Sequence, residues 1–181
     1  MTYLRLAKMA DAAFAHEIQP GYEIAAGYYG GPGAFHVWSK ADWDLFPGFR
    51  LPIWVPSTGN KSGKVDGAEA VRVLRELKVP AGSYTVVDME GMKDRTYVES
   101  FATVLHLEGG YRLWVYGQRS TVFGNPPCNG YWVAEYGISM TAGRHLLEAP
   151  HVRAWQYEAN IAPGYDASLV KQWTEGGMWH G

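Results

Sequence analysis

Short apolar runs alternate with segments of helical spacing along this chain, and this order constrains the fold more than any other feature. The runs are rich in β-branched and aromatic residues, which favour buried strands. They cover residues 3–9, 22–29, 50–55, 84–87, 111–116, 131–136 and 152–157. Helical spacing covers residues 39–46, 67–77 and 96–107, so predicted helices become rare in the last third.

Alternating strands and helices are typical of a parallel sheet that is covered by helices. Because 181 residues suit one domain with a substantial core, we predict a single domain over residues 1–181. About seven or eight strands in one domain predict an α/β fold, a compact TIM-like (β/α) barrel with fewer helices in the C-terminal third. A doubly wound α/β sheet is the alternative.

Composition and charge narrow the classes of partner. The formal net charge of −2 gives no reason to expect nucleic acid or a membrane surface as a partner. Residues 1–15 include Arg5, Lys8 and Asp11 and lack the apolar core of a signal peptide, and no segment is long and apolar enough to span a bilayer. The sequence therefore predicts synthesis in the cytoplasm without a signal peptide.

Two acids, Asp88 and Glu90, follow the apolar run 84–87, and Gly91 ends the segment. Side chains alternate along a strand, so we expect both acids on the same face. Carboxyl groups beside a hydrophobic strand are costly unless the protein uses them. Glycoside hydrolysis is the chemistry that most often requires such a pair. The structural alternative is an Asp that caps the next turn beside a solvated Glu.

Polar residues follow several other predicted strands. They are Asp11, Tyr116, Gln118, Glu135, Tyr136, Gln156 and Glu158, with Asp166 in the loop beyond the last strand. In a parallel barrel the active site gathers at the C-terminal ends of the strands. We therefore expect these side chains to converge on one mouth.

Short motifs between residues 84 and 170 occur in the order that they have in glycoside hydrolase family 25, the lysozyme-like muramidases. The segment Val86–Gly91 resembles that family's D-x-E motif. Trp114–Gly117 resembles the family's strand that ends in Y-G, and Tyr131–Tyr136 resembles its L-W-x-A-x-Y strand. Ala154–Tyr157 resembles its W-Q-Y strand, and Gly164–Leu169 resembles its G-x-V-D-x-N segment. Residues 27–31 and 52–54 resemble the family-25-like barrel domains of actinobacteria and their phages.

The resemblance implies a role for each matching acid. Glu90 matches the general acid, Asp88 its partner carboxylate, and Asp166 the late aspartate at the same mouth. Asp11 matches the aspartate after the first strand, although its surroundings lack the usual D-x-S-x-x-Q-G form. Partial burial and the charge of Asp88 are expected to raise the pKa of Glu90, so that Glu90 is protonated while Asp88 stays ionised.

The resemblance also implies contacts with bacterial cell-wall polysaccharide. The candidate substrate-binding side chains are Tyr116, Trp132, Tyr136, Trp155 and Gln156. Packing in the core is the alternative for each ring, in a chain that is 14% aromatic.

Motifs for other chemistries are incomplete, and no cofactor is implied. His145 and His151 have no acid at metal-ligand spacing, so no metal is expected. Residues 57–65 are one residue short of a phosphate-binding loop. Ser120 lacks the G-x-S-x-G turn of a serine hydrolase.

These observations predict a muramidase-like peptidoglycan hydrolase of phage or actinobacterial origin. Such an endolysin would act at the bacterial cell wall after release by a holin, or as a virion component. The alternative is an inactive barrel of the same type that serves as a structural or wall-binding part of a phage or injection particle. Retention of Asp88, Glu90 and Asp166 favours the enzyme, whereas the altered motif at Asp11 favours the inactive barrel.

Overall fold

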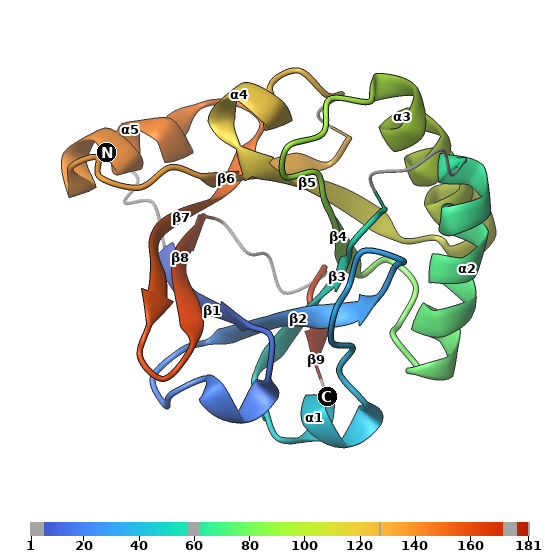
Figure 1. Ribbon diagram of the computed structural model, residues 1–181, viewed down its shortest axis with the longest axis horizontal. Coiled ribbons are helices and arrows are strands. Elements are labelled where there is room, and N and C mark those ends of the chain that lie inside the picture. The colour runs from blue at the N-terminus through green and yellow to red at the C-terminus, as the bar shows by residue number, and fades with distance from the viewer. Residues whose placement is uncertain (1–5, 58–61, 127, 172–176, 181) are drawn as a thin grey trace.

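The computed structural model describes residues 6–57, 62–126, 128–171 and 177–180. Eight strands form a closed barrel in the order β2-β1-β8-β7-β6-β5-β4-β3, and a β2–β3 pairing closes the ring (Figure 1). The strands are β1 (Leu6–Ala12), β2 (Ile24–Gly30), β3 (Phe49–Trp54), β4 (Tyr84–Asp88), β5 (Arg112–Gln118), β6 (Gly130–Ala134), β7 (Val152–Ile161) and β8 (Tyr165–Lys171). The predicted α/β barrel is confirmed. Parts of two predicted segments, residues 3–5 and 58–61, lie outside the described residues.

The strand β8 differs from its neighbours because it runs antiparallel to both β7 and β1, whereas the other barrel pairs are parallel. The prediction that Asp166 lies in a loop is wrong, since Asp166 is the second residue of β8. Polar Asp166, Ser168 and Lys171 interrupt the apolar pattern, which hides the strand in the sequence. A hairpin needs no crossover helix, and this explains the helix-poor C-terminal third.

The predicted helices form, with shifted ends. They are α1 (Lys40–Asp44), α2 (Gly63–Glu76) and α3 (Arg95–Val104), and α3 continues into a π-helical turn over Leu105–Gly109. The predicted capping box is confirmed, because Ser39 Oγ accepts from the Asp42 backbone N–H while Asp42 Oδ2 accepts from that of Ser39. Helices α2 and α3 pack together outside the barrel (Figure 1).

Two helices were not predicted, α4 (Arg119–Val122) and α5 (Met140–Glu148). Glycine weakens a helix interior, and Gly143 lies in the middle of α5. Its missing side chain is required by packing, since a Cβ there would lie 2.0 Å from Trp155 Cζ3. Tertiary contact with the barrel therefore overrides a poor local propensity.

Inward-facing side chains fill the barrel interior. The lower part, toward the N-terminal ends of the parallel strands, is apolar and includes Met9, Val86, Trp114 and Trp132. The short strand β9 (Trp179–His180) pairs with the start of β3, and the preceding Met178 joins this interior cluster. The C-terminal segment thus contributes to the packed lower end, which leaves the opposite end for a site.

Candidate active site

The end of β4 carries the acid pair. Asp88 is the last residue of the strand, and the Glu90 backbone N–H donates to Asp88 Oδ1 at 2.9 Å. Gly91 has φ +72°, a left-handed conformation that glycine adopts without strain, and Met92 N–H donates back to Met89 O. This turn holds Glu90 beyond the strand end, so Asp88 is mostly buried and Glu90 is exposed.

Both acids open to the same space. A pocket of about 460 Å³ is lined by Asp88 and Glu90. The other lining residues are Pro32, Gly33, Val55, Pro56, Ser57 and Met92, from the loops after β2, β3 and β4. The two carboxyl groups therefore meet at one pocket, but Glu90 reaches it from the turn rather than from the strand, and Asp88 caps that turn as the structural alternative also describes.

A chain of hydrogen bonds crosses the mouth from Glu90 to β8. The Tyr116 hydroxyl lies 3.4 Å from Glu90 Oε1 and donates to Gln156 Oε1 at 2.5 Å. Gln156 Nε2 then donates to Asp166 Oδ2 at 2.6 Å, and Asn160 N–H donates to Asp166 Oδ1 at 2.7 Å. The predicted convergence of strand ends is thus observed for β4, β5, β7 and β8.

Asp11 completes the group of acids from the neighbouring strand. It pairs with Asp166 in the β1–β8 register, and it is buried with Oδ1 lacking a hydrogen-bond partner among the described residues. Burial raises the pKa of Asp11 well above its ordinary value, and the charges of Asp166, Asp88 and Glu90 add to this effect. The surroundings of Asp11 therefore favour the neutral form of its carboxyl group.

The pKa values of the other three acids are also raised. Burial raises the pKa of Asp88 to about 7, with a smaller contribution from the charge of Glu90. Burial also raises the pKa of Glu90, assisted by the charge of Asp166, while the Tyr116 hydroxyl opposes the shift. The charge of Asp166 thus acts on Glu90 in addition to the predicted repulsion between Asp88 and Glu90, which is mutual and contributes to the raised pKa of Asp88. A pKa near 7 also means that Asp88 does not stay ionised below neutral pH, contrary to the prediction.

The pKa of Asp166 itself is raised by burial, and its two hydrogen-bond donors oppose that shift. The mouth therefore gathers four carboxyl groups that all bind protons more tightly than exposed acids do. Paired sites whose pKa values are pushed upward are typical of acid–base catalysis. Among the described residues, no group of three or more His, Cys, Asp and Glu side chains is arranged to hold a metal ion.

The five predicted substrate-binding residues occupy different environments. Only Tyr136 presents a ring to solvent, at 47% exposure. Tyr116 and Gln156 are buried within the hydrogen-bonded chain at the mouth. Trp132 is 0% exposed in the lower interior, and its Nε1 donates to Ser168 Oγ. Trp155 is 1% exposed and packs outside the barrel under α5. The prediction of Trp132 and Trp155 as sugar platforms is wrong, because inward and outward alternation buries both.

Sequence reasoning missed other rings at the mouth. Tyr28 on β2 lies within the field of all four acids, which together with burial raises its pKa. Phe35 is 78% exposed in the loop after β2, and its ring centroid lies 6.5 Å from those of Tyr28 and Phe14. Tyr28 could have been found from the strand pattern, since it alternates with inward-facing Ile24 and Ala26. Nothing in the local sequence distinguishes Phe35.

The acids thus meet at the end of the closed barrel where the parallel strands finish, which is where barrels of this type place their active sites. No protein-family profile and no curated protein matches the sequence. Solved structures, in contrast, match over nearly its whole length. A family 25 glycosyl hydrolase from Bacillus anthracis is 14% identical with a TM-score of 0.65, covering 97% of this chain and 92% of that chain.

Two further structures show the same barrel. A Tat-secreted protein from Mycobacterium tuberculosis, solved with L-tartrate, is 16% identical with a TM-score of 0.64 and covers 96% of this chain and 98% of that one. The modular autolysin LytC of Streptococcus pneumoniae, solved with a synthetic peptidoglycan ligand, is 12% identical with a TM-score of 0.64, covering 91% of this chain and 46% of that one. The chain therefore has the lysozyme-like fold of the family 25 glycoside hydrolases.

Proposed function

We propose that this protein hydrolyses a glycosidic bond in the polysaccharide of bacterial peptidoglycan. The observation that carries the proposal is the pair of carboxyl groups, Asp88 and Glu90, that opens into one pocket at the C-terminal mouth of the barrel. Structures with the same fold are named as a family 25 glycosyl hydrolase and as an autolysin bound to a peptidoglycan ligand, which supports the choice of substrate class.

Glu90 is suited to donate a proton to the leaving oxygen. It is the exposed member of the pair, and its raised pKa keeps a larger fraction protonated at mildly acidic pH. The Tyr116 hydroxyl, whose single proton is directed to Gln156 Oε1 at 2.5 Å, lies 3.4 Å from Glu90 Oε1 and opposes the rise in the pKa of Glu90. Tyr116 thus positions Glu90 and offsets part of the cost of its ionisation.

Asp166 is suited to stabilise the positive charge of an oxocarbenium-like transition state. Two donors, Gln156 Nε2 and the Asn160 backbone N–H, hold both of its oxygens and favour its ionised form. Asp88 shares the pocket with Glu90 and titrates near neutral pH, so it contributes negative charge only when it is ionised. Neutral Asp11 beneath them limits the total charge at the mouth.

The proposed place of action is the bacterial cell wall. No helix among the described residues could cross a membrane. Release through a holin, or carriage on a virion, stays a prediction from the sequence, as does an actinobacterial or phage origin. The inactive structural or wall-binding barrel is the outcome to which a failed activity test would lead.

The test is digestion of purified peptidoglycan, with the new reducing ends identified by mass spectrometry. Glu90→Gln should lower the rate about a hundredfold or more, the range that general acids contribute. Glu108→Gln, which changes an exposed acid in the π-helical turn, is the matched control and should keep full activity. Absence of release by the unaltered protein from several wall types, between about pH 4 and 8, would refute the proposal.

A further inference from the structure

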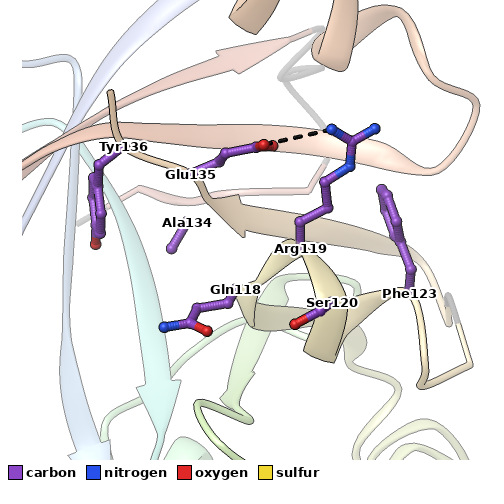
Figure 2. Close-up of a pocket in the computed structure, with 7 residues that line it drawn as sticks. All are labelled: Gln118, Arg119, Ser120, Phe123, Ala134, Glu135 and Tyr136. Atoms are coloured by element: carbon purple, nitrogen blue, oxygen red, sulfur yellow. Dashed lines mark hydrogen bonds and ion pairs between the residues drawn. The ribbon is translucent and has the colours of Figure 1, made fainter. Parts of the chain in front are cut away.

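A second, larger pocket adjoins the mouth where β5 and β6 end. It has a volume of about 620 Å³, and Figure 2 shows the side chains that surround it. They are Gln118, Arg119, Ser120, Phe123, Ala134, Glu135 and Tyr136, from the end of β5, from α4 and from the end of β6. None of the four acids at the mouth lines this space, so the proposed chemistry does not use it.

The pocket holds a cation and an anion that only partly satisfy each other. Arg119 Nη1 lies 3.4 Å from Glu135 Oε1, a single contact at the long end of the range (Figure 2). Glu135 Oε2 is buried and has no hydrogen-bond partner among the described residues. The Arg119 side chain is largely exposed. The exposed guanidinium donors of Arg119 therefore face the pocket beside a carboxylate that they only partly satisfy.

The backbone of Glu135 is held in place by the neighbouring strand. Its N–H donates to Gln156 O at 3.2 Å, and its carbonyl accepts from Trp155 Nε1 at 2.9 Å. The buried indole is itself fixed against Gly143 of α5. Trp155 thus acts as a positioning residue for the backbone of Glu135 at the edge of the pocket.

The pocket borders the mouth and is continuous with a second space. Tyr136 lines the pocket on the side of the mouth, where its hydroxyl interacts with that of Tyr116. In the other direction, a space of about 280 Å³ shares Arg119, Phe123 and Glu135 with it. That space continues between α4 and α5 to Ile138, Ala142, His145, Leu146 and Ala149. Together they form a groove that leads from the mouth over the rim of the barrel.

We propose that this groove binds the peptide branch of a peptidoglycan substrate, an inference that rests on the proposed function. A neutral sugar chain requires no paired cation and anion, whereas a peptide branch carries carboxylates, amide N–H groups and amines. Arg119 would bind a carboxylate of the branch, and the exposed part of the Glu135 carboxylate would accept from an amide or ammonium N–H. Exposed Phe123 offers apolar contact. The direction of the groove, away from the mouth, suits a branch rather than the glycan itself.

The test is a calorimetric titration of the Glu90→Gln protein, which separates binding from turnover. Two ligands are compared, a peptidoglycan disaccharide that carries its peptide and the same disaccharide without it. We expect the peptide-bearing ligand to bind about tenfold more tightly or better, as one or two charged hydrogen bonds would produce. In the same background, Arg119→Gln and Glu135→Gln should reduce that preference to about twofold or less.

The matched control is Arg72→Gln, an exposed arginine on α2, which should keep the preference. Thermal unfolding of each variant shows that it is folded. Equal affinity for the two ligands, or failure to bind either of them, would overturn the proposed groove. Peptide-dependent binding without hydrolysis by the unaltered protein would refute the proposed activity but retain the groove. Equal cleavage of intact and peptide-free glycan, with no binding preference, would refute the groove but retain the proposed activity.

Discussion

The same strands form both ends of the barrel interior, but one end is filled with apolar side chains and the other carries acids and hydrogen-bonding groups. On β1, β4 and β5, the inward position near the bottom holds Met9, Val86 or Trp114, and these are buried apolar side chains. Two residues further along the same strands stand Asp11, Asp88 and Tyr116. Each layer holds a buried polar atom without a hydrogen-bond partner among the described residues, Trp114 Nε1 below and Asp11 Oδ1 above, but the acids with raised pKa values lie in the upper layer.

This difference indicates that the lower layer stabilises the barrel, whereas the upper layer costs stability. Burying apolar side chains is favourable, whereas a buried acid is tolerated only when it is neutral or hydrogen-bonded. The upper layer meets that condition by protonation of Asp11 and by the chain from Tyr116 through Gln156 to Asp166. Stability and the proposed chemistry are therefore separated along one axis, and substitutions at each end should have distinct consequences.

The largest expected effect is a loss of folding stability when the lower layer is changed. Trp132→Ala should lower the free energy of unfolding by about 3–5 kcal/mol, because it removes a fully buried ring. Trp132→Phe keeps most of the ring but loses the hydrogen bond to Ser168 Oγ, so it should cost about 1–2 kcal/mol. Urea unfolding measures both. A loss below about 1 kcal/mol for the alanine variant would contradict the packed lower layer.

For Asp88→Asn at the upper layer we expect a smaller change in the free energy of unfolding, and this change is an increase in stability. The native pKa of about 7 exceeds the ordinary value of 3.8, so between these pH values the native state holds a proton that the unfolded state has released. Stability therefore falls as pH rises through this window. The amide removes the loss and keeps the acceptor for Glu90 N–H, so the variant should gain on the order of 2 kcal/mol at pH 8 and nothing near pH 4.

Urea unfolding at pH 4 and at pH 8 measures this gain. Asp44→Asn is the control, because the pKa of exposed Asp44 is lowered by its hydrogen bond with Lys40, and its replacement should bring no gain at pH 8. If Asp88→Asn showed the same dependence on pH as the unaltered protein, the raised pKa would be wrong. The contrast between the two layers would then weaken.

The smallest effect is expected for Tyr116→Phe, and it concerns the rate of cleavage and its dependence on pH. Loss of the hydroxyl removes the donor that lowers the pKa of Glu90, so that pKa should rise further. The alkaline limb of kcat/KM should move to higher pH, and the rate should fall about five- to tenfold for one lost hydrogen bond. Tyr111→Phe is the control, since it loses a hydroxyl that donates to Val79 O outside the barrel. If the alkaline limb of kcat/KM did not shift in Tyr116→Phe, the Tyr116 hydroxyl would have no influence on the pKa of Glu90.

Strong local patterns were sufficient to predict much of the fold. Apolar runs and the Ser39–Asp42 capping box located strands and the start of a helix. The helix α5 and the strand β8 were missed because their signals are non-local. Gly143 is explained only by the indole that packs on it. The polar residues of β8 are explained by three different partners: Gln156 at the mouth for Asp166, the Trp132 indole for Ser168, and backbone carbonyls at the end of α5 for Lys171. Local propensity cannot register a partner that is distant in sequence.

The sequence by itself determined the alternating elements, the family resemblance and the four acids Asp11, Asp88, Glu90 and Asp166. Residue type and spacing carry that information, because strand alternation and strand-end chemistry are local properties. Tertiary structure decided which rings are accessible, that Asp166 also acts on Glu90, and that Arg119 and Glu135 line one pocket. Burial and electrostatic interaction depend on distances in space, and these distances exist only after the barrel has closed.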